Sequence, residues 1–120
     1  MLTATNLEAQ FAEVNDYWSP KVLGKVNDQY IKVAKLKGEL TWHHHEDEDE
    51  LFYIVKGQMT IQFDHGQVEL SEGDFYVVSK GQRHNPIAKE ECWIMLIETV
   101  TTKHTGNIQT PKTKTIEQQL

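Results

Sequence analysis

The sequence predicts an all-β fold, a barrel or sandwich of antiparallel strands that follows a short helix. From residue 22 onward, short runs rich in Val, Ile, Tyr, Phe and Trp alternate with turn residues, which is typical of many short strands. After residue 20 no strand–helix–strand alternation is found, so a parallel α/β sheet is not expected. The expected strands are 22–26, 30–37, 40–45, 51–56, 59–64, 67–70, 74–79, 84–88 and 92–99.

The beginning of the chain predicts the short helix. Leu7, Phe11 and Val14 recur at helical spacing and make one apolar face, which we expect to pack on the outside of the barrel. Thr5 and Glu8 have the spacing of a capping box, in which each side chain bonds a free backbone N–H.

The chain has 120 residues, the size of one domain. We divide it into an N-terminal helical extension (1–20), a barrel (21–100) and a C-terminal tail (101–120), which is rich in Thr, Lys and Gln. The single cysteine, Cys92, has no partner for an internal disulfide, which fits a reducing compartment. We expect its thiol to be buried as a small hydrophobe.

Charge and hydropathy exclude two classes of partner. The formal net charge is −6 and no basic stripe is present, so a nucleic-acid partner is not expected. No run approaches the about 18–20 apolar residues of a membrane span, and the N-terminus lacks the pattern of a signal peptide. We therefore expect a cytoplasmic protein without a membrane partner.

The segment around residues 42–52 carries most of the chemistry. On a strand, residues i and i+2 point to the same face, so His43 and His45 share a face while His44 points outward. Glu50 follows an acidic turn and opens the next strand, which swings its carboxylate back beside the two imidazoles. Two imidazoles and a carboxylate are suitable ligands for a divalent transition metal. Phe52 shares the inward face of Glu50, as does Ile54, and we expect both to line an apolar cavity.

Two motifs in the barrel region resemble those of cupins. His43-x-His45, four residues, Glu50, six residues and Gly57 is similar to the first cupin motif, and residues 73–84, which end in His84, are similar to the second. The resemblance covers about residues 38–97. It implies a double-stranded β-helix, or jelly-roll, cupin barrel that often forms a dimer. It also implies one metal ion held by His43, His45, Glu50 and His84, and it is the source of the fourth ligand and of the topology.

The site leaves several functions open. A single divalent ion (Mn, Fe, Ni or Zn) with free coordination positions suits a metal-dependent oxygenase or a sugar-phosphate isomerase-like enzyme, for which no catalytic residue is assigned. The alternative is a non-catalytic module that binds or senses a small molecule, and a third interpretation is a metal-free barrel. The fold alone does not choose among them. We also expect a homodimer, because such barrels leave apolar outer-sheet surface and open edge strands. His104 lies in the tail, and the sequence indicates no partner for it.

Overall fold

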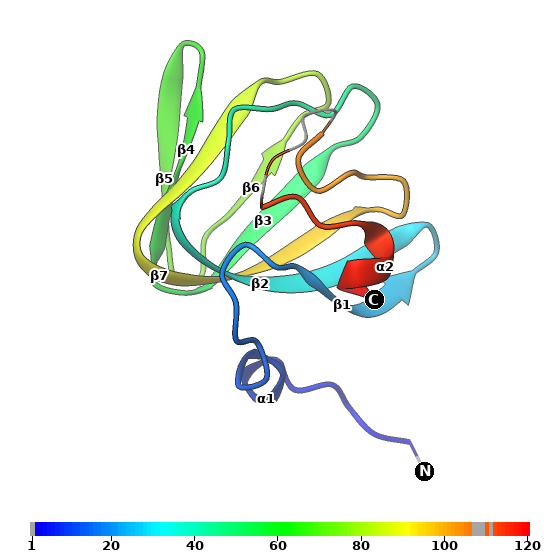
Figure 1. Cartoon of the computed structure of the whole chain (residues 1–120). Coiled ribbons are helices and arrows are strands. Elements are labelled where there is room, and N and C mark those ends of the chain that lie inside the picture. Colours follow the sequence, from blue (N-terminus) through cyan, green and yellow to red (C-terminus); the bar gives the residue numbers. More distant parts are fainter. Residues whose placement is uncertain (1, 107–109, 111) are drawn as a thin grey trace.

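Antiparallel strands form the body of the protein, as the sequence predicts (Figure 1). The structure, a computed structural model, describes residues 2–106, 110 and 112–120. In chain order the elements are α1 (Leu7–Phe11), β1 (Lys21–Val26), β2 (Gln29–Glu39), β3 (Glu50–Lys56), β4 (Gln58–Phe63), β5 (Gly66–Ser71), β6 (Phe75–Val78), β7 (His84–Thr99) and α2 (Ile116–Gln119).

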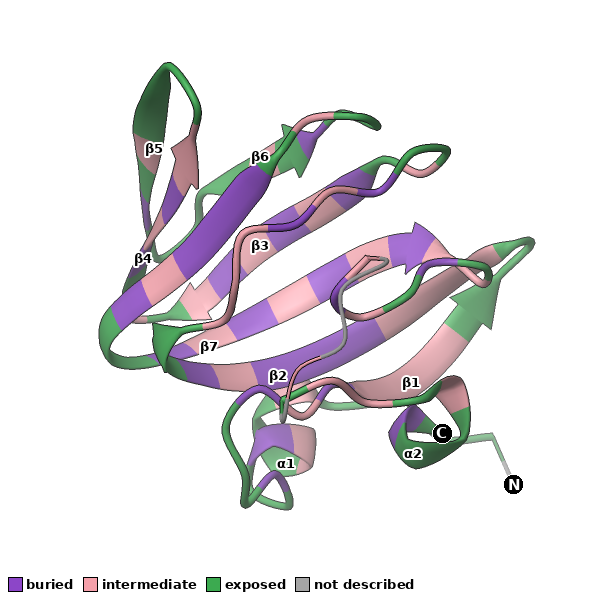
Figure 2. Ribbon diagram, turned by 45° about the horizontal axis from the view of Figure 1, so that its top comes forward, coloured by how far each residue is buried: buried purple, intermediate pink, exposed green. Residues whose placement is uncertain are grey.

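The long strand β7 organises the sheet. Strands run in the order β1-β2-β7-β3-β6, while β4 pairs with both β5 and β7. The first residues of β7 pair with β4, with Ile87 opposite Thr60, whereas its second half lies between β2 and β3, with Ile97 opposite both Ile31 and Leu51. The strand therefore bends from one side of the barrel to the other, as its curved ribbon shows in Figures 1 and 2. This bend brings the start of β7 next to the loop that precedes β3.

Two strand predictions are wrong. Residues 84–88 and 92–99 form the single strand β7, and the change of direction between them is absorbed by a register shift between Leu36 and Gly38 of β2. Residues 40–45 are not a strand. The Leu40 N–H donates to the Pro86 carbonyl and the His45 carbonyl accepts from the Gly81 N–H, but the one bridge of strand type in this segment is at His43. Its N–H donates to the carbonyl of His84 at 2.9 Å, and the N–H of His84 donates back at 2.8 Å. β7 begins at His84, so residues 44 and 45 have no β7 residue opposite them to continue the pairing.

Apolar side chains pack on both faces of the sheet. Phe52, Ile54, Ile61 and Ile94 belong to the cluster inside the barrel. This follows from strand periodicity, because alternate residues point to the same face. Figure 2 shows the resulting alternation of buried and partly buried residues along strands such as β3 and β7.

The helix α1 packs on the outside of the barrel, as its apolar spacing predicts. Phe11 and Val14 form a second cluster with Val33, and the ring of Phe11 stacks on Trp93 with centroids 4.8 Å apart. The predicted capping box is wrong. The helix has only five residues, and its N-cap is Asn6 rather than Thr5: the Asn6 side chain accepts a hydrogen bond from the Ala9 N–H at 2.9 Å.

After β7 the chain turns back across the barrel and ends in α2 (Figure 1). Thr115 caps α2 in a capping box with Gln118. On the same helix Gln119 is 2% exposed, and its Oε1 accepts a hydrogen bond from the buried Lys32. None of the helices in the described part of the chain is long and apolar enough to cross a membrane.

Candidate metal centre

Four side chains converge inside the barrel mouth. His43 and His45 come from the loop between β2 and β3, Glu50 is the first residue of β3, and His84 is the first residue of β7. One potential ligand atom from each lies within 4.8 Å of all the others, and all four residues are buried. The structure thus brings together all four residues singled out from the sequence. His43 and His45 reach the same centre although their segment is not a regular strand.

Backbone carbonyls fix the orientation of two imidazoles. The Nδ1 of His43 lies 2.9 Å from the carbonyl oxygen of Thr41, and the Nδ1 of His84 lies 2.9 Å from that of Gln82. A carbonyl only accepts hydrogen bonds, so each Nδ1 carries the proton and each Nε2 keeps its lone pair. A backbone partner of this kind is the usual way in which proteins orient a metal-binding histidine.

The spacing of the free ligand atoms fits a bound ion. The Oε1 of Glu50 lies 3.7 Å from the Nε2 of His45 and 3.7 Å from the Nε2 of His84. These distances are too long for hydrogen bonds. Atoms that each lie about 2.0–2.2 Å from one ion are separated by such distances. Within the described chain, the Nε2 atoms of His45 and His84 are buried without a hydrogen-bond partner, which is costly unless something else occupies the space between them. The residues present therefore fit a divalent metal ion.

Electrostatics favour the protonation states that bind metals. Burial, reinforced by the neighbouring His84, lowers the pKa of His43 to about 4, so its imidazole is neutral at neutral pH. Burial alone would raise the pKa of Glu50. The interaction with Glu98 and the nearby imidazoles of His45 and His84 outweigh burial and hold that pKa well below its usual range. Neutral imidazoles around an ionised carboxylate are the form required for coordination.

A buried ion pair supports Glu50 from behind. Glu98 of β7 lies opposite Glu50 of β3 in the sheet. Its Oε1 lies 2.7 Å from the Nζ of Lys32, and both side chains are almost completely buried. Burial and the charge of Glu50 raise the pKa of Glu98 well above its usual range. Lys32 also bonds Gln119 of α2, so the C-terminal helix is connected to Glu50 through two intervening side chains.

These supporting residues were not identified from the sequence. Glu98 stands at the same alternating position as Ile94 and Leu96, so a polar residue in the inward series of β7 is the signal that could have revealed it. Lys32 has no such clear signal, because β2 carries apolar residues on both faces. His104, which lines a cavity at the site, lies outside the helices and strands, so sequence periodicity does not indicate which way its side chain points.

A small, largely apolar cavity adjoins two of the four candidate ligands, His43 and Glu50. It offers about 30 Å³, which is room for one or two water molecules. The polar residues of its described lining are His43, Glu50 and His104. Trp18 also lines the cavity, but its indole N–H is bonded to the carbonyl of Lys37 at 2.8 Å. The apolar lining consists of Trp18, Pro20, Ala34, Leu36, Leu40, Phe52, Pro86, Ile94 and Leu96.

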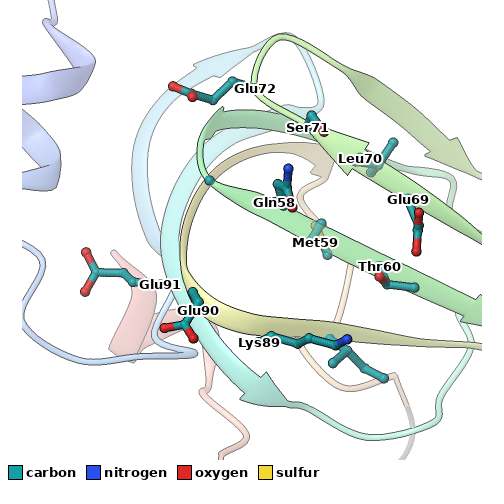
Figure 3. Close-up of a pocket in the computed structure, with 12 residues that line it drawn as sticks. Gln58, Met59, Thr60, Glu69, Leu70, Ser71, Glu72, Lys89, Glu90 and Glu91 are labelled. Atoms are coloured by element: carbon teal, nitrogen blue, oxygen red, sulfur yellow. The ribbon is translucent and has the colours of Figure 1, made fainter.

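The cavity contains Phe52 as expected, whereas Ile54 is fully buried in the core and does not line it. A larger hollow of about 770 Å³ lies on the outside of the barrel along β4, β5 and β7 (Figure 3). Its rim includes Glu69 and Glu72 but, among its described lining residues, no histidine or cysteine. The chemistry of the molecule therefore concentrates at the smaller, buried site.

The fold and the four side chains can be compared with known proteins. Residues 30–97 match the family described as Cupin domain. The chain belongs to the cupin family. This cupin is 36% identical over 80 residues to the uncharacterised protein YdbB of Bacillus subtilis, with 66% of this chain and 71% of that protein covered.

Two solved structures are similar to this cupin over most of both chains. A cupin-2 domain protein from Shewanella frigidimarina has 42% identity and a TM-score of 0.78, covering 79% of this chain and 93% of its own. Protein NMB1881 from Neisseria meningitidis has 30% identity and a TM-score of 0.75, covering 81% and 99%. The jelly-roll barrel predicted from the two motifs is thereby confirmed.

Two other residues, His44 and Cys92, have the ordinary roles expected of them. His44 points away from the centre and is partly exposed, with its Nε2 3.8 Å from the Oε1 of Glu46. Cys92 is fully buried, and burial raises the pKa of its thiol to about 12. Such a thiol is protonated at neutral pH and therefore unreactive.

Proposed function

We propose that this cupin binds one divalent transition-metal ion through His43, His45, Glu50 and His84 and uses it to act on a small molecule. One observation carries the proposal: the buried Nε2 atoms of His45 and His84, which have no hydrogen-bond partner among the described residues, lie near the ionised carboxylate of Glu50 at distances that suit a shared ion. A metal-free barrel would leave these polar atoms uncompensated in the interior, at a cost in stability.

The donor set suggests which ions the site takes. Three imidazoles and one carboxylate suit Mn, Fe, Ni or Zn, and cellular supply decides among them. When bound, such an ion supplies Lewis acidity and, if it is iron, the capacity to bind dioxygen. The chain contributes the rest: Thr41 and Gln82 orient imidazoles, and apolar walls keep bulk water out.

The size of the cavity favours a small reacting molecule. About 30 Å³ is far below the roughly 300–1,000 Å³ of typical organic-ligand pockets. Water or dioxygen fits in this space, whereas a sugar phosphate requires displacement of the residues around it. This favours oxygenase-type chemistry over a sugar-phosphate isomerase-like reaction, with any organic substrate approaching from the barrel mouth.

A non-catalytic binding role is the second candidate, and the scarcity of acid–base groups favours it. Apart from two of the ligands, the described lining offers a single titratable side chain, His104. The two candidates are separated by measuring oxygen consumption and product formation in iron-loaded protein with a panel of organic substrates. Turnover that disappears in His45→Ala supports an enzyme, while saturable binding without turnover supports a binding module.

Metal content tests the proposal directly. Protein without a histidine tag is incubated with Mn, Fe, Ni or Zn, freed of excess metal and analysed by inductively coupled plasma mass spectrometry. We expect about one equivalent in the wild type and in His44→Ala, and less than a tenth of an equivalent in His45→Ala. The two variants remove adjacent histidines, so they differ in ligation rather than in histidine content. Wild-type protein without metal under all four conditions would refute the proposal.

A further inference from the structure

His104 occupies a position that the proposed metal ligands do not explain. It follows β7, in the segment that turns back over the barrel, and its imidazole lines the same cavity as His43 and Glu50. The other residues of the described lining are apolar, with the Trp18 N–H engaged elsewhere. A molecule that enters this cavity therefore meets one polar side chain that is not a proposed ligand, the imidazole of His104. One of its two ring nitrogens, Nδ1, is bonded to a described partner, and the other is Nε2.

The backbone around His104 fixes the orientation of its ring. The N–H of Lys114 donates a hydrogen bond to the Nδ1 of His104 at 3.1 Å. Since Nδ1 accepts this bond, the proton of the neutral ring is on Nε2, which is the only remaining donor. Burial lowers the pKa of His104 to about 4 despite the opposing charge of Glu50, so the neutral form prevails at neutral pH.

The segment that carries His104 is packed closely against the first metal-binding loop. Gly106 has φ +62°, and a Cβ at this position would collide with the carbonyl oxygen of His44. Only glycine permits this approach without displacing the loop. The packing holds the C-terminal segment beside His43 and His45, and it places the His104 ring at the cavity wall in a defined position.

We propose that His104 donates a hydrogen bond from Nε2 to the small exogenous ligand of the metal ion and thereby determines which ligands the site prefers. The ligand class is a small molecule or anion with a lone pair, such as water, azide or a dioxygen-sized species. The inference rests on the proposed metal site, and it goes beyond that site by assigning selectivity to a residue of the C-terminal segment. His104 is a specificity-determining residue here, and not a fifth ligand.

Cobalt and azide provide a test that does not require knowledge of the substrate. Wild type, His104→Gln and His104→Phe are loaded with Co²⁺, and azide is titrated while the visible absorption of Co²⁺ is recorded. Gln keeps an N–H donor at the position of Nε2, whereas Phe keeps the ring shape without a donor. A lost hydrogen bond to an anion weakens binding roughly tenfold or more. We therefore expect the azide Kd to rise about tenfold in His104→Phe and less than threefold in His104→Gln.

The outcomes separate failure of this inference from failure of the proposed function. If the wild type takes up no Co²⁺, the metal site is wrong and the inference falls with it. If the wild type binds Co²⁺ and azide while His104→Phe has the same azide Kd, the inference alone is wrong. If azide binding weakens equally in His104→Phe and His104→Gln, His104 acts through packing. If His104→Phe folds but binds less Co²⁺, His104 is itself a metal ligand. Either result overturns the inference. Thermal unfolding followed by circular dichroism monitors folding, and His104→Leu replaces His104→Phe if that variant does not fold.

Discussion

The buried ion pair behind the metal centre allows a quantitative prediction. Lys32→Met removes the ammonium group and keeps a side chain of similar length in the same space. The Nζ of Lys32 lies 2.7 Å from the Oε1 of Glu98, and the two side chains are 0% and 3% exposed. Removing one partner of a buried pair costs about 3–5 kcal/mol. Without Lys32 the carboxyl of Glu98, whose pKa burial and Glu50 already raise, must either stay charged without compensation or take up a proton. A domain of this kind has a total free energy of unfolding of about 5–15 kcal/mol, so the loss should be easy to measure.

Urea unfolding of the metal-free protein measures this loss, with Lys21→Met as the matched control. Lys21 pairs with Glu13 at 3.3 Å, but the side chains are 40% and 68% exposed. Exposed pairs contribute at most about 1 kcal/mol, so the same chemical change at Lys21 should cost far less. The double variant Lys32→Met/Glu98→Gln should regain part of the stability, because it removes the charge left unpaired.

Two results would refute this reasoning. If Lys32→Met costs no more than Lys21→Met, then Lys32 and Glu98 do not act as a buried pair. If the double variant is as unstable as Lys32→Met alone, the loss comes from packing or from the bond to Gln119 and not from an uncompensated Glu98.

Further predictions concern the turns, the pH dependence and the outer face. Gly57 and Gly73 have φ +88° and +89°, but a Cβ would meet the backbone at Gly57 alone of the two, where it would lie 2.7 Å from the carbonyl oxygen of Glu91. In urea unfolding, Gly73→Ala should lower the free energy of unfolding by about 1–2 kcal/mol, and Gly57→Ala should lower it by about 1–3 kcal/mol more. Equal losses in the two variants would contradict the steric argument. His104 has a pKa of about 4 in the fold against 6.5 ordinarily, so the unfolded chain binds more protons between these values. The stability of the metal-free protein should therefore fall as the pH drops from 6.5 towards 4, by about 3 kcal/mol more than in His104→Gln; parallel pH profiles in chemical unfolding would count against a buried, neutral His104. The homodimer remains a prediction, and Phe75, which is 62% exposed on the edge strand β6, is a candidate interface residue. Light scattering at tens of micromolar should report a dimer for the wild type and a monomer for Phe75→Glu. A monomeric wild type would contradict the prediction.

The barrel and its four candidate ligands could be predicted because their signals are local. Alternating apolar residues identify most strands, and the spacing of His43, His45 and Glu50 is set by a single short loop. His84 entered through the resemblance of a second motif, since nothing local indicates that it meets the other three. The error at residues 40–45 has a physical cause: the alternating pattern indicates which side chains share a face, but a strand also needs a neighbour to pair with. The side chains converge as expected although the hydrogen-bonded ladder is missing.

The residues behind and above the centre depend on long-range packing. Lys32 and Glu98 are 66 positions apart in sequence, and their proximity follows from the pairing of β2 with β7, in which Tyr30 lies opposite Glu98 and Lys32 opposite Leu96. The position of His104 depends on how an irregular segment docks, which Gly106 and the Lys114 backbone determine. Neither arrangement produces a periodic pattern, and thus the sequence indicates the ligands more clearly than the groups that tune them.

The C-terminal segment contributes to the surroundings of the candidate metal centre, although all four candidate ligands come from the barrel region. It contacts the site in three places: His104 lines the cavity, Gly106 packs on the loop of His44, and Gln119 bonds Lys32 behind Glu98. Among the described lining residues of the cavity, His104 is the one that this segment contributes, so the segment forms one part of the cavity wall. A protein with the same four ligands but a different tail would present a different opening to small molecules. If His104 acts as we propose, the selectivity of this site resides in a segment that contributes none of the four candidate ligands.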